Sequence, residues 1–118
     1  MVELREFPRY RTDVTLEFGA ADARMSGMTW DVSRGGMFIR TTKKPEVGQK
    51  LLVTLRFPEG RQLLIQGEVV RTFQPSAISR ESQPAGFAVA IKNGDSHQNN
   101  DSYQRFVDSV AAQSRASA

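Results

Sequence analysis

The sequence predicts an all-β domain that ends in one α-helix. Apolar and β-branched runs fill the middle of the chain, breaks rich in glycine, proline and aspartate separate them, and a stretch with helical spacing follows. The chain has 118 residues, of which 39% are hydrophobic and 25% are charged. This is the size and composition of one ordinary globular domain, so we expect a single core.

Five segments have the alternation or β-branched content that is typical of strands: 14–18, 37–41, 51–57, 63–72 and 86–92. Turn-forming residues separate them at 19–22, 33–36, 45–48 and 58–60, and the Pro-Glu-Gly sequence of 58–60 predicts a hairpin. Because a small sheet has to close or cover its edges, five or six short strands predict an antiparallel barrel or a sandwich.

The end of the chain predicts a helix. A polar segment at 74–84 predicts a long loop, and residues 93–100 predict a linker to a helix over 101–113. Asn100 or Asp101 can cap this helix, and residues 114–118 are expected to fray. One face of the helix is apolar and is expected to pack against the sheet or a barrel mouth. That face carries Tyr103, Phe106, Val107, Val110 and Ala111.

The charge suggests anionic partners but does not indicate a dedicated nucleic-acid binder. The formal net charge is only +3, a modest excess beside that of a dedicated nucleic-acid binder. Within residues 1–14 three arginines are balanced by three acids, so the N-terminal segment is not a polybasic arm. The local surplus lies at 31–44, which holds four cations and one acid.

The sequence also disfavours membrane insertion and export. It has no cysteine and no apolar run of the roughly 18–20 residues that a bilayer span needs. Charges and Pro8 stand where a secretory signal would place its apolar stretch. We therefore expect a cytoplasmic protein that does not enter a membrane.

Two short motifs can carry ligand chemistry, and the first is Arg5-xxx-Arg9. Pro8 favours extended backbone at Phe7, and in an extended chain residues four apart face the same way, about 13 Å from each other. Two guanidinium groups can thus address separate phosphates or guanine O6 and N7 edges of a dinucleotide-sized ligand. Taken alone, two solvated surface arginines are the simpler interpretation.

The second motif is the segment 31–36. The Asp31 carboxylate can accept the N1 and N2 protons of guanine, while Ser33 and the amides of Gly35 and Gly36 donate to phosphate or base oxygens. The alternative is a plain hairpin turn in which Asp31 and Ser33 bond their own backbone. The two motifs complement each other, because the arginines bind acceptors and Asp31 binds donors.

The sequence shows no pattern that is typical of a catalytic or metal-binding site. His97 is the only histidine and lies in the predicted linker, and no cluster of His, Asp and Glu has metal-ligand spacing. We expect no enzymatic activity, no cofactor and no metal. Trp30 directly precedes Asp31, and strand alternation would point it away from Asp31, which favours packing over stacking on a base.

Together the motifs resemble the signature of the PilZ domain family, RxxxR followed by (D/N)xSxxG. The segment 67–71 (GEVVR) is similar to the family's GxVVR strand, and 86–91 is similar to its closing GxGVxF strand. Ala88 and Ile91 depart from that last pattern, where a second glycine and an aromatic residue are usual. The resemblance covers about residues 4–113.

The resemblance implies a six-stranded antiparallel β-barrel over residues 12–92 with a C-terminal helix, and cyclic di-GMP as the ligand. Arg5 and Arg9 would hold phosphates and guanine. The opposite wall would comprise Asp31, Ser33 and Gly36, with Arg34 and Gly35 at the variable positions of the motif as secondary candidates.

The N-terminal segment is the expected switch. Residues 1–11 hold few apolar side chains, so we expect a flexible arm that closes on the ligand and creates a surface for a protein partner. Leu4 adds no cation before Arg5, which favours one ligand per protomer over an intercalated ligand pair.

Two other hypotheses stay open. One is a PilZ-fold module that binds a protein, with weak or no nucleotide binding. The other is a small barrel for single-stranded nucleic acid, which needs aromatic platforms along a basic groove. The balanced N-terminal charge and the core-like positions of several aromatic residues disfavour this last hypothesis.

Overall fold

The structure is a computed structural model that describes residues 8–20, 24–43, 45–75, 84–91 and 97–117. Its elements, in chain order, are β1 (Tyr10–Arg11), β2 (Thr15–Gly19), β3 (Met25–Ser33), β4 (Gly36–Arg40), β5 (Lys50–Arg56), β6 (Gln62–Phe73), β7 (Gly86–Ile91) and α1 (His97–Ser117).

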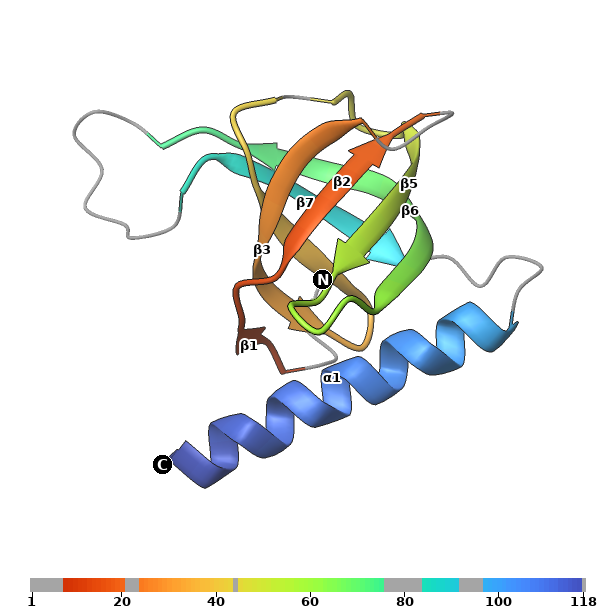
Figure 1. Ribbon diagram of the computed structural model, residues 1–118. Coiled ribbons are helices and arrows are strands. Elements are labelled where there is room, and N and C mark those ends of the chain that lie inside the picture. The colour runs from red at the N-terminus through yellow and green to blue at the C-terminus, as the bar shows by residue number, and fades with distance from the viewer. Residues whose placement is uncertain (1–7, 21–23, 44, 76–83, 92–96, 118) are drawn as a thin grey trace.

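Six of the strands close into an antiparallel barrel (Figure 1). The hydrogen-bonded order is β3-β2-β5-β6-β7-β4, and β4 pairs back with β3. The short strand β1 precedes β2 along the same edge of β3, where Tyr10 and Arg11 pair with Val32 and Asp31. The prediction of a six-stranded antiparallel barrel with a C-terminal helix is confirmed, and the hairpin predicted at 58–60 joins β5 to β6.

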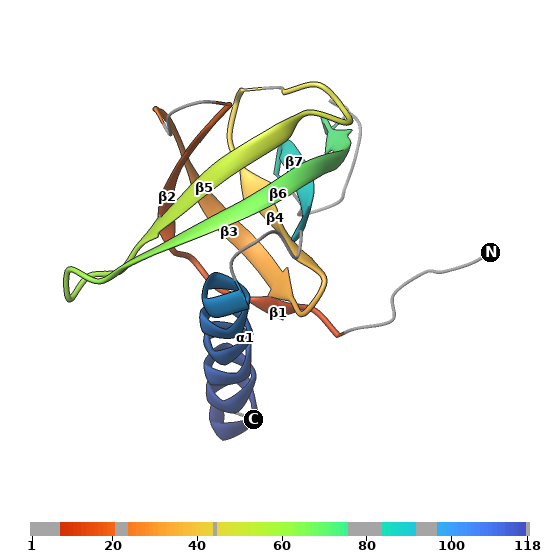
Figure 2. The ribbon, with the colours of Figure 1, turned by 90° about the vertical axis from the view of Figure 1, so that its right-hand side faces the viewer.

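The alternation of the strands builds the core. Along β5 the side chains of Leu51, Val53 and Leu55 are buried, while their neighbours are partly or fully exposed. Full burial of one such side chain stabilises the fold by about 1.5–3 kcal/mol. The interior is continuous with the apolar face of α1, which lies across one end of the barrel (Figures 1 and 2). Phe106 of α1 packs edge-on against Phe57, with the ring centroids 5.3 Å apart.

The helix differs from its predicted bounds at both ends. It begins at His97 and not at 101, and it continues to Ser117. Residues 97–100 are polar and were therefore assigned to a linker, but polarity alone does not prevent a turn of helix from forming ahead of an apolar face. The five residues predicted for that face are all buried. Across the described residues, no helix combines the length and the apolar character needed to span a bilayer.

Two strands were not predicted from the sequence. Strand β3 lacks a regular alternation, and β1 covers only two residues, which were assigned to the N-terminal arm. The arm predicted at 1–11 therefore overlaps β1 by two residues, because Tyr10 and Arg11 belong to the sheet. Most of the loop predicted at 74–84, and residues 93–96 of the predicted linker, lie outside the described residues.

Candidate functional site

A β-bulge in β3 brings the Asp31 motif to the barrel surface. The register between β3 and β4 shifts between Thr29 and Asp31, so that Trp30 is an extra residue without a partner on β4. Thr29 and Val32 are both fully buried, although residues three apart face opposite ways in a regular strand. The bulge therefore leaves two successive side chains, Trp30 and Asp31, partly exposed between two buried ones.

A second bulge lies across the barrel wall, in β6. The register between β6 and β7 shifts between Val69 and Arg71, which makes Val70 the extra residue. Val69 is buried, whereas Val70 is 49% exposed, a high value for a valine. Alternation from the buried Val69 places Val70 on the outer surface of the barrel, and the bulge leaves the next side chain, Arg71, on that surface as well.

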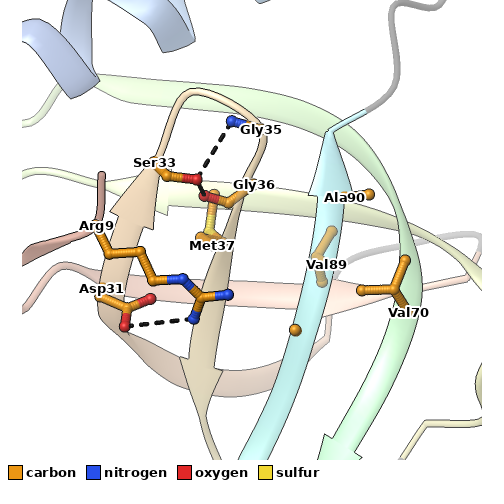
Figure 3. Close-up of a pocket in the computed structure, with 10 residues that line it drawn as sticks. Arg9, Asp31, Ser33, Gly35, Gly36, Met37, Val70, Val89 and Ala90 are labelled. Carbon is orange, nitrogen blue, oxygen red and sulfur yellow. Dashed lines mark hydrogen bonds and ion pairs between the residues drawn. The ribbon is translucent and has the colours of Figure 1, made fainter. Parts of the chain in front are cut away.

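A pocket of about 140 Å³ lies between these two bulges. One side is formed by Arg9, Asp31 and the 33–36 turn, and the other by β6 and β7 (Figure 3). In Figure 3 the Arg9 guanidinium passes Asp31 and extends toward β7. The lining consists of Arg9, Asp31, Ser33, Gly35, Gly36, Met37, Val70, Ala88, Val89 and Ala90.

Arg9 and Asp31 form the charged part of the pocket. The Arg9 Nη1 atom lies 3.7 Å from Asp31 Oδ2, and the two side chains are 31% and 17% exposed. An ion pair at this distance is longer than a hydrogen bond. The donors of the guanidinium and the lone pairs of the carboxylate are therefore available to a ligand that enters between them.

Ser33 shapes the turn that follows Asp31. Its hydroxyl accepts a hydrogen bond from the Gly35 amide and donates one to the Gly36 carbonyl, each at 3.3 Å. Such bonding to the local backbone is the alternative to a ligand-binding role that the sequence leaves open for Ser33. Both contacts are longer than the usual 2.7–2.8 Å of an O–H···O bond and 2.9–3.0 Å of an N–H···O bond, so they are weak and can be exchanged for contacts with a ligand.

Gly36 is required by the neighbouring strand. A Cβ atom at this position would lie 2.0 Å from the Val89 carbonyl oxygen of β7, which no side chain can tolerate. The glycine thus permits the close pairing of β4 with β7. That pairing holds the turn against the pocket.

Tyr103 of α1 holds the same turn from the other side. Its hydroxyl lies 2.7 Å from the Ser33 carbonyl oxygen and 2.8 Å from the Gly36 carbonyl oxygen, and the residue is fully buried. Burial raises the pKa of the Tyr103 hydroxyl well above its usual value, and the charge of Asp31 adds a smaller rise. The phenol is therefore protonated and acts as a donor.

Arg34 and Trp30 lie near the pocket but do not line it. Arg34 forms a 3.0 Å ion pair with Asp108 of α1 and points toward a second pocket, of about 230 Å³, between β1 and α1. Trp30 is half-buried, and the Arg11 guanidinium stacks on its ring, 3.5 Å from the centroid. The expectation that alternation turns Trp30 away from Asp31 is wrong, because the bulge interrupts that alternation.

The structure thus brings together Arg9, Asp31, Ser33, Gly35 and Gly36 from the predicted set. Arg5 and Leu4 lie outside the described residues. Sequence reasoning missed Val70 and Tyr103. The signals available were two successive valines, which break the alternation of a strand, and a hydroxyl on an otherwise apolar helix face. Within the described ranges, no three His, Asp or Glu residues gather as a metal site would require.

Comparison of the sequence with models of protein families gives the family of the chain. The model of the PilZ domain matches residues 3–109. The chain belongs to the PilZ family. No curated protein sequence matches it.

Two solved structures share this PilZ fold. One is the PilZ domain with c-di-GMP of YcgR from Escherichia coli, with a TM-score of 0.70 and 16% identity over 98% of this chain and 97% of that one. The other is the Bacillus subtilis inhibitor of motility (MotI/DgrA), with a TM-score of 0.70 and 14% identity over 96% of this chain. This chain spans about half (54%) of the Bacillus protein. At these identities the likeness shows the fold alone.

Proposed function

We propose that this PilZ domain is a bacterial cytoplasmic receptor for cyclic di-GMP that acts through a protein partner and catalyses no reaction. The observation that carries the proposal is the meeting of Arg9 and Asp31 over the 33–36 turn, in one pocket. The guanidinium offers paired donors to a phosphate or to guanine O6 and N7, and the carboxylate accepts from guanine N1 and N2. The two groups together match both edges of a guanine nucleotide.

The size of the pocket supports a ligand that is held only in part by the barrel. Small-molecule sites usually enclose about 300–1,000 Å³, whereas this pocket has about 140 Å³. A pocket of this size accommodates one end of a dinucleotide. We propose that Arg5 contributes the remaining contacts and that one ligand binds per protomer.

We further propose that the segment ahead of β1 closes over the bound ligand and creates the surface that a partner protein recognises. The strand β1 anchors this segment directly beside Asp31, because Arg11 pairs with Asp31 across the ladder. Hydrogen exchange of the amides of residues 2–9, with and without cyclic di-GMP, tests the closure. Exchange that is unaffected by the ligand would contradict it.

Calorimetric titration tests the binding itself. We expect cyclic di-GMP to bind with a micromolar or lower Kd at one site per protomer, and GTP and a short single-stranded oligonucleotide to bind much more weakly. Absence of cyclic di-GMP binding would favour the alternative, a PilZ module that binds proteins without the nucleotide.

Substitutions then test the assignment of the site. Arg9→Ala or Asp31→Ala should weaken binding about tenfold to a hundredfold, because each removes a charge-assisted contact of about 1.5–3 kcal/mol. Arg56→Ala is the matched control, since Arg56 is a half-exposed arginine that pairs with Glu17 on the β2–β5 face. Affinity like that of the wild type in Arg9→Ala and Asp31→Ala would overturn the site assignment.

A further inference from the structure

The carbonyl groups of the 33–36 turn are held mainly by the C-terminal helix. The single hydroxyl of Tyr103 lies between the carbonyl oxygens of Ser33 and Gly36, at 2.7 and 2.8 Å. The neighbouring Gln104 donates from Nε2 to the Arg34 carbonyl oxygen, at 3.0 Å. Consecutive residues of one helix therefore hold three of the carbonyls of this turn.

The remaining carbonyl of the turn is held by the barrel. The Gly35 oxygen accepts a hydrogen bond from the amide of Ile91, the last residue of β7, at 3.0 Å. Every carbonyl oxygen from residue 33 to residue 36 thus lies within hydrogen-bonding distance of a donor from α1 or β7. These contacts, from α1 and from the end of β7, hold the turn in one orientation.

Fixing the carbonyls also fixes the amides that a ligand would meet. A trans peptide is planar, and its carbonyl and the following N–H point in opposite directions. The hydrogen bonds to the Ser33 and Arg34 oxygens consequently set the orientation of the N–H groups of Arg34 and Gly35. In the absence of these bonds, a turn that contains two glycines has wide conformational freedom.

The buried hydroxyl is the dominant contact between the helix and the turn. Arg34 and Asp108 also join the two elements, but their side chains are 52% and 59% exposed, and such surface pairs contribute little. Tyr103 is fully buried, and its hydroxyl is a side-chain donor for the Ser33 carbonyl oxygen and one of two side-chain donors for the Gly36 oxygen, which keeps the 3.3 Å bond from Ser33 Oγ when Tyr103 is removed.

We propose that α1 is part of the ligand site: the Tyr103 hydroxyl, assisted by Gln104, positions the 33–36 turn, so that helix docking and cyclic di-GMP binding are coupled. This inference rests on the proposed function. Coupling of this kind is reciprocal, because a helix that strengthens ligand binding is itself stabilised by the ligand to the same extent. Tyr103 is a positioning residue, since it lies behind the turn and does not line the pocket.

The test compares Tyr103→Phe with Val110→Ala. The first keeps the ring and removes only the hydroxyl. The second lies on the same buried face of α1 and weakens helix packing without removing a contact to the turn. We expect Tyr103→Phe to raise the Kd for cyclic di-GMP about tenfold. Val110→Ala should lower the melting temperature and leave the Kd within about twofold of the wild type.

Two further measurements separate positioning from general stability. Gln104→Ala should raise the Kd about threefold to fivefold, and it tests the same idea if Tyr103→Phe folds poorly. Saturation with cyclic di-GMP should slow hydrogen exchange of the α1 amides in the wild type, and less so in Tyr103→Phe.

The outcomes are distinct. If the wild type does not bind cyclic di-GMP, the proposed function fails, and the coupling fails with it. If the wild type binds, but Tyr103→Phe and Gln104→Ala bind equally well, only the coupling is overturned. A loss of affinity in Val110→Ala as large as that in Tyr103→Phe would also overturn the specific role of the hydroxyl.

Discussion

At the scale of single residues, the buried hydroxyl of Tyr103 contacts two backbone carbonyls of the 33–36 turn. Burial raises the pKa of its hydroxyl from the usual value of 10.0. Below pH 10 the folded and unfolded chains both retain the proton. Above it the unfolded chain loses the proton and the folded chain keeps it, so the free energy of unfolding falls as the pH rises.

Tyr103→Phe should therefore be less sensitive to alkali than the wild type. At pH 8 we expect the variant to be less stable by about 1–3 kcal/mol, because the hydrogen bonding of the buried Tyr103 hydroxyl to the Ser33 and Gly36 carbonyls is lost. Above about pH 10 the gap should narrow by up to about 1.4 kcal/mol per pH unit. Urea unfolding at pH 8, 9.5 and 11 measures the gap. A difference in unfolding free energy that is the same at all three pH values would show that Tyr103 does not retain its proton in the folded state.

The two sequence motifs and their resemblance to the PilZ signature predicted the charged half of the candidate site. Arg9 and Asp31 were identified because their donors and acceptors match opposite edges of guanine, and the structure brings them to 3.7 Å. Val70 and Tyr103 were missed because their roles depend on tertiary structure. Val70 lies at the pocket because β6 pairs with β7, and Tyr103 reaches the turn because α1 lies across the end of the barrel.

At the scale of the elements, the bulged strand β3 shows where pattern reasoning fails. Strand β3 was missed because Gly27 and the extra residue Trp30 interrupt its alternation. Its inward positions also include Thr29, a polar residue that is fully buried. The Thr29 hydroxyl bonds to the Thr12 carbonyl and the Val14 amide, partners that no local pattern indicates. The strands with regular patterns were predicted to within a few residues.

The β4–β7 pair of the barrel permits a test of its packing. A Cβ atom at position 86 would lie 2.0 Å from the Ile39 carbonyl oxygen, which is backbone and cannot move aside. Gly86→Ala should therefore destabilise the fold by at least about 1–3 kcal/mol and lower the melting temperature.

Gly27→Ala is the comparison for this substitution. The nearest atom to its new methyl group would be a side-chain methyl of Ile39, at 3.0 Å, which can shift. Alanine also lowers the conformational entropy of the unfolded chain, which stabilises the fold by about 0.4–1 kcal/mol and offsets the crowding. We therefore expect a small net change in the free energy of unfolding. Equal melting temperatures for the two variants would contradict the packing argument.

At the scale of the whole molecule, the electrostatic field favours an anionic ligand only modestly. The formal net charge is +3, and Arg9 is balanced locally by Asp31. Exposed charge is screened by salt, over a distance that shrinks from about 10 Å at 0.1 M to about 3 Å at 1 M. Cyclic di-GMP has two phosphates, and the proposed contacts with them are charged.

Affinity for cyclic di-GMP should therefore fall severalfold between low and high salt. Titrations at 0.05 and 0.5 M potassium chloride measure the change, and melting temperatures at both concentrations control for stability. A Kd that does not change with salt would point to stacking or neutral hydrogen bonds as the main source of affinity.

The closure of the barrel also has a consequence for the order of folding. The 33–36 turn lies early in the chain, but the atoms that fix its carbonyls belong to Ile91, Tyr103 and Gln104, near the end. Chains emerge from the ribosome from the N-terminus, at about 5–20 residues per second. The β3–β4 hairpin therefore leaves the ribosome well before its supports. A growing chain therefore acquires these contacts to the turn only after α1 has been made, so we expect cyclic di-GMP to bind chains that include α1 and not shorter nascent chains.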